Sequence, residues 1–226
     1  LKKFGFSSAL KNKKVLMTAG PTIEHIDPVR VITNQSTGKT GLSLASELIS
    51  AGAKVTLVYG PGEEKPPNGA KIINVLSSKE MLNAVKTELK KKFDIVIMTA
   101  AVADYIPTNP SKKKIKSSKN EIKISLKKAP KIIDQIKKFQ KNVLLVGFKA
   151  ETNLTKNQLI KSAQKKLKES SSDMIVANDI GSSRYKKNPQ NNQVIIVDTE
   201  KVVMSKWMNK QKIAKFIKKQ IEQKIK

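Results

Sequence analysis

Residues 14 to 51 read KVLMTAGPTIEHIDPVRVITNQSTGKTGLSLASELISA. The apolar run at residues 14 to 18 is typical of a short buried strand, and apolar positions spaced three or four apart predict a helix over residues 38 to 51. A polar loop that carries glycines connects the two. The stretch therefore has the order strand, loop, helix, and the rest of the chain repeats it.

The loop between this strand and this helix has the residues of an anion site. Unpaired N–H groups and the positive end of the helix dipole favour an oxyanion at a helix start. Glycine lets a ligand approach the backbone, hydroxyls add donors, an arginine can hold an anion in a bidentate fork, and an asparagine can offer its amide to a carbonyl or a phosphate. The residues concerned are Arg30, Asn34, Ser36, Thr37, Gly38 and Gly41. An ordinary capped helix is the alternative, and Arg30 and Asn34 favour the ligand site.

Short apolar runs and helical patterns alternate through the remaining sequence. The predicted strands span residues 14 to 18, 54 to 59, 71 to 76, 94 to 99, 142 to 148, 173 to 177 and 193 to 198. The predicted helices span residues 38 to 51, 78 to 91, 130 to 139, 155 to 170 and 209 to 225. This alternation predicts an α/β fold with a mainly parallel sheet covered on both faces, whose ligands bind beyond the carboxyl ends of the strands.

Two segments depart from the alternation. Residues 1 to 12 have no periodicity and are interpreted as a linker or the end of an upstream segment, so one domain is expected over residues 13 to 226. Residues 108 to 128 are rich in Lys, Ser and Asn, and we interpret them as a flap that can form a hairpin. Within the flap, three apolar residues alternate with polar ones as in a half-buried strand: Ile122, Ile124 and Leu126.

The composition bounds the class of protein. At 226 residues, with 38% apolar and 28% charged residues, the chain can bury a sizeable core and is expected to be globular. The absence of cysteine excludes disulfides, thiolate nucleophiles and zinc–thiolate sites, and the single histidine, His25, excludes a multi-histidine metal site. No apolar run is long enough for a membrane span and no signal peptide is recognisable, so a cytoplasmic location is expected.

The net charge of +27 raises the hypothesis of a nucleic-acid-binding protein, because clustered Lys and Arg neutralise phosphates. However, the lysines are spread over predicted helix faces, and aromatic residues, which would stack on bases, make up only 4% of the chain. A solvated lysine-rich surface is the favoured interpretation. Its field would still attract small anionic substrates.

Three familiar nucleotide motifs are absent. Gly38-Lys39-Thr40 resembles the end of a P-loop, but the glycine required five positions before Gly38 is Thr33. No G-x-G-x-x-G opens a helix, and none of the three tyrosines has a lysine four residues later, as a short-chain dehydrogenase requires. A nicotinamide enzyme is therefore disfavoured.

Two later strand ends carry further candidate residues. Small residues at positions 100 to 103 would let a base or a ribose approach the backbone, and Asp104 can accept hydrogen bonds from hydroxyls or an amino group. A lysine of the cluster at residues 112 to 116 could close over a triphosphate and neutralise charge at the α-phosphorus. Phe148, at the end of another strand, could lie against a base. The structural alternatives are alanines packed under a helix, a solvated lysine loop and a core phenylalanine.

These loops together resemble the phosphopantothenoylcysteine synthetase family, over about residues 13 to 205. The matching elements are Thr18-Ala-Gly-Pro-Thr22, Ile26-Asp-Pro-Val-Arg30, Asn34 through Gly41, Ala100 through Tyr105, Lys114-Ile-Lys116, Val146-Gly-Phe148, Ala150-Glu-Thr152 and Val176-Ala-Asn-Asp179. The resemblance implies a ligase in coenzyme A biosynthesis. In this reaction the phosphopantothenate carboxylate attacks the α-phosphate of CTP, giving an acyl cytidylate and pyrophosphate, and cysteine then displaces CMP.

The resemblance also implies a role for each candidate residue. Asn34 is similar to the asparagine that contacts the acyl intermediate, and Asn34 and Lys114 are the expected catalytic residues. The expected phosphopantothenate-binding residues are Arg30, Asn34, Ser36, Thr37 and Gly38. The expected CTP-binding residues are Ala100, Ala101, Asp104, Lys114, Pro130, Lys131, Ile132, Ile133, Phe148 and Lys166. Mg²⁺ is expected with the triphosphate, and no residue of the chain is assigned as a metal ligand.

The sequence thus predicts a Rossmann-like three-layer α/β sandwich with a mainly parallel sheet and a lysine-rich flap. By resemblance, the expected partners are phosphopantothenate, CTP and cysteine, a second copy of the chain in a homodimer, and a fused upstream decarboxylase flavoprotein domain. Two alternatives remain. One is the same ligase using ATP, and the other is a basic nucleic-acid-binding Rossmann-like module, which predicts salt-sensitive binding without nucleotide turnover.

Four positions depart from the family's usual pattern. Thr37 stands where Ser-Ser-Gly has its second serine, and it keeps the hydroxyl. Ser117 replaces the second of two adjacent flap lysines, and Ser170 replaces a lysine four residues after Lys166, so contacts to the triphosphate tail are expected to differ. Lys131 stands where an Asp is frequent.

Overall fold

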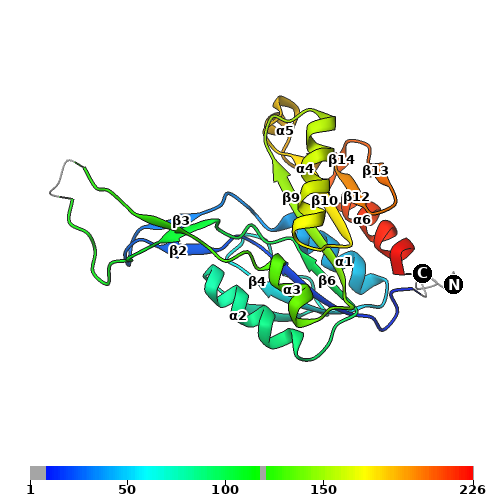
Figure 1. Cartoon of the computed structure of the whole chain (residues 1–226), viewed down its shortest axis with the longest axis horizontal. Coiled ribbons are helices and arrows are strands. Elements are labelled where there is room, and N and C mark those ends of the chain that lie inside the picture. The colour runs from blue at the N-terminus through cyan, green and yellow to red at the C-terminus, as the bar shows by residue number, and fades with distance from the viewer. Residues whose placement is uncertain (1–8, 118–120, 226) are drawn as a thin grey trace.

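The computed structural model describes residues 9–117 and 121–225, and its largest element is an eight-stranded sheet (Figure 1). The strands of this sheet are β1 (Lys14–Ala19), β4 (Lys54–Tyr59), β5 (Lys71–Asn74), β6 (Ile95–Met98), β9 (Leu144–Glu151), β10 (Met174–Asp179), β12 (Ile195–Asp198) and β13 (Val202–Met204). Their order in space is β13-β12-β10-β9-β6-β1-β4-β5. The continuous apolar runs form the central strands because those strands are buried on both faces.

Strand order reverses at β1. From β1 the chain moves to β4 and β5 on one side, and later to β6, β9 and β10 on the other, with all these pairs parallel. The antiparallel pairs of this sheet, among the described residues, are β10 with β12 and β12 with β13, at one edge. The carboxyl ends of β1 and β6 are therefore neighbours at a topological switch point, where ligands of open α/β sheets bind.

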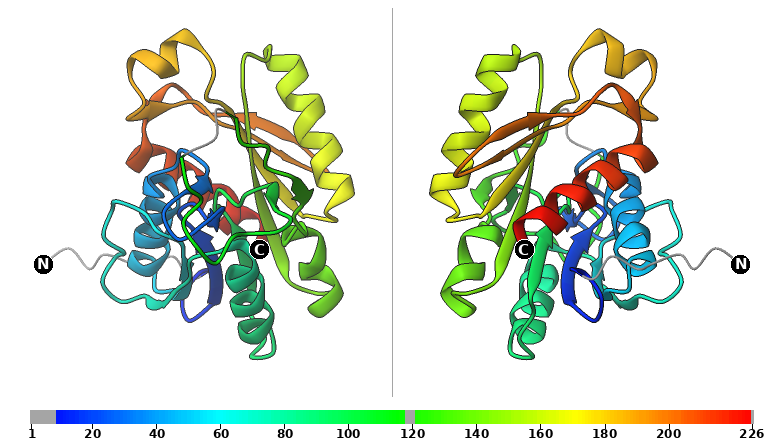
Figure 2. Two further views of the ribbon diagram at one scale, coloured as in Figure 1. Left: turned by 90° about the vertical axis from the view of Figure 1, so that its left-hand side faces the viewer. Right: turned by 90° about the vertical axis from the view of Figure 1, so that its right-hand side faces the viewer.

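Helices cover both faces of the sheet (Figure 2). Helices α1 (Lys39–Ser50) and α6 (Lys210–Ile225) share one core cluster, in which Leu44 and Leu48 are buried together with Ile217 and Ile221. Helices α2 (Ser78–Leu89), α3 (Ile133–Phe139) and α4 (Lys156–Glu169) cover the opposite face. Several helix starts carry the Ser and Thr caps that are typical of helix N-termini. Thr155, for example, forms a capping box with Gln158 at the start of α4.

Short elements complete the fold. Two antiparallel pairs form an arm that projects from the sheet, on the left in Figure 1: β2 (Ile23–His25) with β3 (Val31–Thr33), and β7 (Tyr105–Pro107) with β8 (Leu126–Lys128). The remaining short elements are α5 (Ser183–Lys187), β11 (Asn191–Asn192) and β14 (Met208–Asn209), of which β11 and β14 pair antiparallel.

The predicted α/β class, the mainly parallel sheet and its long helices are confirmed. Three expectations are wrong in detail. The helix predicted from residue 130 begins at Ile133, because the chain is still extended at Ala129, whose N–H donates to the backbone oxygen of Asp104. Residues 122 to 125 are not a strand, since the β7–β8 pairing ends at Pro107 and Leu126 and is followed by a single bond from the N–H of Thr108 to the backbone oxygen of Ser125. Ile122, Ile124 and Leu126, expected to be half-buried, are all exposed.

The predicted linker also differs. Leu10 is fully buried in the core beside α1 and α6, and the N–H of Asn12 donates to the backbone oxygen of Gly52. The fold therefore begins before Lys13, at least at Leu10. Residues 1–8 of the predicted linker lie outside the described residues.

Candidate functional site

The loops that follow β1 and β6 are joined by backbone hydrogen bonds. The N–H of Ala101 donates to the oxygen of Gly20 at 2.9 Å, and the N–H of Thr22 donates back to the oxygen of Ala101 at 3.3 Å. The buried hydroxyl of Thr22 accepts a third bond from the N–H of Ala103 at 3.0 Å. The two strand ends thus form one rigid unit at the switch point.

Glycines let the surrounding segments approach this unit. Gly20 and Gly38 both have positive φ angles, of 79° and 76°, which side chains rarely tolerate. A Cβ atom on Gly41 would collide with Oγ1 of Thr99 and lie 2.9 Å from Cβ of Ala19. Helix α1 therefore starts in direct contact with the ends of β1 and β6, as a ligand site at its N-terminus requires.

Asn34 connects the predicted anion loop to the loop after β6. Its side-chain nitrogen donates to the backbone oxygens of Ala101 at 3.2 Å and Val102 at 3.1 Å. The structure therefore places Asn34 beside Ala101, one of the predicted nucleotide-site residues. The side-chain nitrogen of Asn34 is thus already bonded to two backbone carbonyls.

Residues 36 to 38 form the turn into α1. The hydroxyl oxygen of Ser36 accepts from the N–H of Gly38, and that of Thr37 accepts from the N–H of Lys39. No side chain caps the helix at Gly38. The hydroxyls therefore stabilise the turn, while the start of α1 is left to a ligand or to water.

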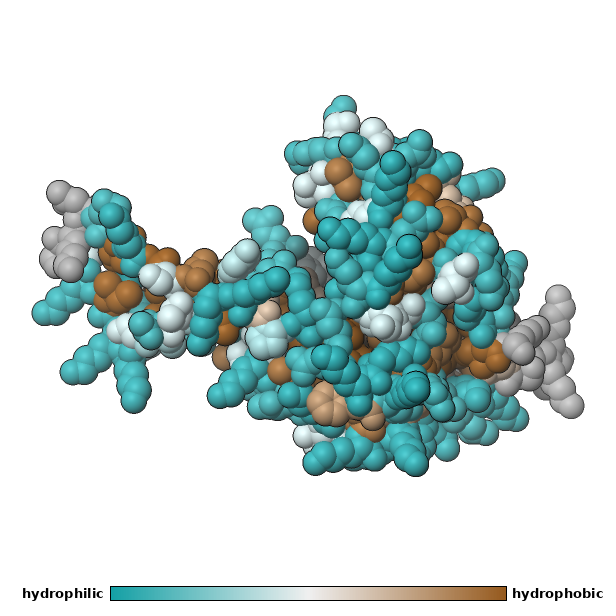
Figure 3. Space-filling model, in the orientation of Figure 1, coloured by the Kyte–Doolittle hydropathy of each residue, from teal (hydrophilic) through white to brown (hydrophobic). Residues whose placement is uncertain are grey.

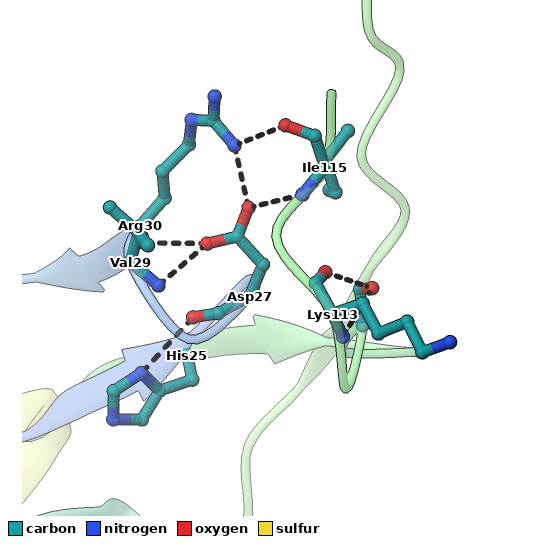
Figure 4. Close-up of polar contacts among 7 residues, drawn as sticks. His25, Asp27, Val29, Arg30, Lys113 and Ile115 are labelled. Atoms are coloured by element: carbon teal, nitrogen blue, oxygen red, sulfur yellow. Dashed lines mark hydrogen bonds and ion pairs between the residues drawn. The ribbon is translucent and has the colours of Figure 1, made fainter. Parts of the chain in front are cut away.

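Arg30 is paired within the protein (Figure 4). One guanidinium nitrogen donates to Oδ2 of Asp27 at 2.6 Å and to the backbone oxygen of Ile115 at 3.1 Å. Oδ1 of Asp27 accepts from the N–H groups of Val29 and Arg30, and Oδ2 also accepts from the N–H of Ile115. Burial opposes ionisation of Asp27, but these hydrogen bonds hold the pKa of its carboxyl well below the usual range. One nitrogen of the predicted anion fork of Arg30 is thus engaged by Asp27 and Ile115.

The second group of predicted nucleotide residues lies around the end of β6. Ala100, Ile132 and Ile133 belong to the same apolar cluster under α2 and α3, and Ile132 is buried there. Asp104 is exposed and forms an ion pair with Lys131. The loop from Pro130 to Ile133 therefore lies beside residues 100 to 104. Ile132 packs in the core. Lys131 pairs with Asp104, whose carboxylate was expected to accept hydrogen bonds from hydroxyls or an amino group.

Phe148 and Lys166 are on opposite faces of the sheet. Phe148 packs against the core cluster of α1 and α6, which is the structural alternative stated above. Lys166, on α4, donates to the carboxylate of Asp134 on α3 at 2.9 Å and is largely covered. Ser170, which replaces a lysine of the family, is buried and caps α4 by donating to the backbone oxygen of Lys166. Through Asp134, Lys166 lies next to the helix that follows the loop from Pro130.

The flap lies along the arm. Its Ser111 N–H donates to the oxygen of Ile26, and Ile115 binds Asp27 and Arg30, so the lysine cluster is held beside the β2–β3 turn. Lys114 is exposed, and within residues 9–117 and 121–225 its side chain makes no hydrogen bond or ion pair with the other predicted nucleotide residues. Residues 118–120 of the predicted flap lie outside the described part. Figure 3 shows apolar residues gathered on the arm, and the exposed ones include Val29, Tyr105, Ile122, Ile124 and Leu126.

Several residues near the site were not among the predicted site residues. Thr18 and Thr22 are fully buried at the switch point and hold the loop after β6. Asp27 organises the turn before Arg30 and could have been found, since Asp before Pro is a turn signal. Lys210, at the start of α6, has a pKa lowered by burial and by the charge of Lys39 beside the start of α1. No local pattern pointed to Lys210.

The described residues contain neither a cluster of metal-binding side chains nor a helix suited to cross a membrane. Within residues 9–117 and 121–225, no group of three or more His, Cys, Asp or Glu side chains could hold a metal ion. In the same part of the chain, every helix is too short or too polar to span a membrane.

A polar loop at the switch point of a mainly parallel sheet, joined to a loop of small residues, defines an α/β domain of the open-sheet class, in which ligands bind at this position. The chain belongs to the family described as DNA/pantothenate metabolism flavoprotein C-terminal domain, which it matches over residues 10–225.

Individual relatives agree with this assignment. The chain is 40% identical over 215 residues to the coenzyme A biosynthesis bifunctional protein CoaBC of Thermococcus kodakarensis, covering 95% of this chain and 52% of that protein. The chain thus spans about half the length of this relative. The solved C-terminal domain of a coenzyme A biosynthesis bifunctional protein CoaBC has a TM-score of 0.79 and 34% identity, covering 95% of this chain and 98% of that one. The DNA/pantothenate metabolism flavoprotein of Streptococcus pneumoniae has a TM-score of 0.81 and 29% identity, covering 93% and 98%.

Proposed function

We propose that the chain catalyses the ligation of 4'-phosphopantothenate to cysteine with CTP, by way of an acyl cytidylate. The observation that carries the proposal is the bond from Asn34 to Ala101 and Val102, because it joins the anion loop to the small-residue loop in one site. Family membership supports it, and so does the description of matched relatives as coenzyme A biosynthesis proteins.

The first half-reaction needs cations more than a base. A carboxylate that attacks a phosphate meets like charge, so lysines, backbone N–H groups and a metal ion carried by the triphosphate lower the barrier. Lys114, on the flap, would neutralise the charge that develops at the α-phosphate. Mg²⁺ usually takes one or two protein carboxylates and keeps its phosphate ligands. The exposed Asp104 would supply such a carboxylate once the ion replaces Lys131 as its partner.

The second half-reaction needs a site that holds the acyl group while the amine of cysteine attacks and CMP leaves. The start of α1, left without a side-chain cap at Gly38, can hold the acidic end of phosphopantothenate. The oxygen of the Asn34 amide would accept from the attacking amine. These groups position the reactants and require no histidine or cysteine in the chain.

Two partners belong to this proposal. The exposed apolar residues of the arm suit contact with a second copy of the chain in a homodimer, since a contiguous apolar patch is typical of interfaces. A decarboxylase flavoprotein would supply the complementary activity, because the Thermococcus relative is a bifunctional protein.

A pyrophosphate-release assay tests the function. With phosphopantothenate and CTP alone, pyrophosphate should appear in a burst, and steady turnover should require cysteine. Pyrophosphate release with ATP at equal concentration should be much slower. The reason is that Ala100, Ala101 and the loop from Pro130 resemble the corresponding residues of cytosine-selective members of the family. Equal rates with ATP would remove the cytidylate assignment, and no release with either nucleotide would remove the ligase.

A further inference from the structure

Asp27 has no part in the proposed reaction, although its carboxylate is buried and both of its oxygens accept hydrogen bonds. Oδ1 accepts from two N–H groups of its own turn, at Val29 and Arg30, at 2.8 and 2.7 Å. Oδ2 accepts from Arg30 at 2.6 Å and from the N–H of Ile115 at 3.1 Å. One oxygen therefore serves the β2–β3 turn, and the other connects that turn to the flap.

Ile115 is held at both of its backbone groups. Its N–H donates to Asp27, and its oxygen accepts from the guanidinium of Arg30 at 3.1 Å. Because a peptide unit is planar, fixing the Ile115 N–H also fixes the carbonyl of the preceding Lys114. A third bond, from the N–H of Ser111 to the oxygen of Ile26 at 2.8 Å, holds the start of the same segment.

We infer that Asp27 is a positioning residue, which acts through Arg30 and the backbone of Ile115 to hold the flap in the conformation that presents Lys114. The inference rests on the proposed function for the role of Lys114 and on the contacts alone for the holding of the flap. It assigns Arg30 to the same unit, because its guanidinium bridges the carboxylate and the flap carbonyl.

The negative charge and two-oxygen geometry of Asp27 are both needed for this role. In an Asp27→Asn variant, one carboxylate oxygen becomes an NH₂ group, which cannot accept from Ile115 or Arg30. The amide can keep its oxygen toward Val29 and Arg30, so the turn itself can persist. The flap bond is then lost while the hairpin remains.

Hydrogen exchange tests the holding of the flap without reference to catalysis. In Asp27→Asn, deuterium uptake by peptides covering residues 111–117 should be faster by about tenfold or more, because the bonds that close this segment are lost. Uptake in β1 and α1 should not change. An Ile115→Pro variant removes the flap donor while leaving the Asp27 carboxylate unchanged, and it should give the same increase if the carboxylate variant proves unable to fold. A Lys112→Ala variant, at an exposed position of the same segment, is the matched control.

A double-mutant cycle tests the link to Lys114. Asp27→Asn should slow pyrophosphate release roughly tenfold to a hundredfold through kcat, with the KM for phosphopantothenate unchanged, because displaced catalytic groups lose rate rather than binding. In a Lys114→Gln background the same change should cost less than about twofold, since residues that act as one unit are not additive.

The outcomes separate the two hypotheses. Unchanged uptake at residues 111–117 in both variants would overturn the positioning role, and so would losses that multiply in the cycle. If the wild-type chain releases no pyrophosphate, the proposed function fails, and the exchange experiment still decides whether Asp27 holds the flap.

Discussion

The side-chain nitrogen of Asn34 lies 3.1 Å from the backbone oxygen of Val102, across the junction between the loops after β3 and β6. The same nitrogen donates to Ala101, so both amide hydrogens are used inside the protein. The family resemblance implies contact between Asn34 and the acyl group. The bonds in this structure leave only the amide oxygen for that contact, and they make the nitrogen a connector of the two loops.

Asn34→Asp should therefore slow both half-reactions. The new carboxylate oxygen would face two carbonyl oxygens, at a cost of about 1–2 kcal/mol, or roughly five- to thirtyfold in rate. A single-turnover experiment with CTP and phosphopantothenate, followed by cysteine, measures the burst and amide formation separately. Gln35→Ala, one residue along the exposed loop, should leave both near wild type. A full burst with slow amide formation would restore the acyl-group role.

Lys114→Gln should slow the first half-reaction. Removing one preorganised donor to a developing charge costs about 2.7–4 kcal/mol, or roughly a hundred- to a thousandfold in rate. The burst of pyrophosphate measures this loss directly. Lys112→Gln, on the same flap and equally exposed, should change the rate little. If both variants are equally active, the cluster is a solvated loop.

Gly41→Ala should destabilise the fold although alanine favours helices. The added methyl would collide with Thr99 and lie 2.9 Å from Cβ of Ala19, so α1 would have to move away from the sheet. Overpacking of this kind costs about 1–3 kcal/mol, more than the gain in helix propensity. Urea unfolding measures the difference, with the exposed Ser46→Ala in the same helix as control. A more stable Gly41→Ala would show that the contact relaxes freely.

Glu88 should make stability depend on pH in the acid range. Burial opposes its ionisation, but hydrogen bonds from Lys91 and Lys71 lower its pKa below the ordinary value. A lowered folded-state pKa contributes stability above the unfolded-state pKa, and this contribution is lost as the pH falls through the folded value.

The matched variant is Glu88→Gln. It should be less stable than wild type by about 1–2 kcal/mol near neutral pH, and the gap should narrow below about pH 4. Denaturant unfolding at several pH values checks this expectation. The control, Glu169→Gln, removes an exposed carboxylate 3.9 Å from Lys165 and should show little difference at any pH. A gap for Glu88→Gln that is constant with pH would contradict the assignment.

The sheet was predictable because its strands are buried on both faces. Burial on both faces leaves uninterrupted runs such as Ile95 to Met98, and their alternation with helices sets the parallel topology. The arm was not predictable in the same way. Strands β2, β3, β7 and β8 have three residues each, and their apolar positions, such as Val31 and Leu126, are exposed. These strands are defined by hydrogen bonds and turns, which produce no periodic pattern of apolar residues in the sequence.

The sequence allowed us to predict which loops form the candidate site, but not which side chains pair within it. Residues 34 and 100 to 104 lie together as the topology requires, and residues 130 to 133 adjoin them. The partner of Arg30 was missed, although Asp27 lies only three residues away. The bond from Ile115 to Asp27 spans 88 residues, and no local spacing in the sequence encodes it.

The contact between α1 and α6 has a consequence for the synthesis of the chain. Ile217 and Ile221 cover Leu44 and Leu48, yet the ribosome must translate seven of the eight strands of the described sheet between them before the two helices can meet. The nascent chain will therefore emerge with the outer face of its central strand and first helix uncovered, a state that invites aggregation or chaperone binding. Folding of this domain should be completed late in translation, when α6 leaves the exit tunnel.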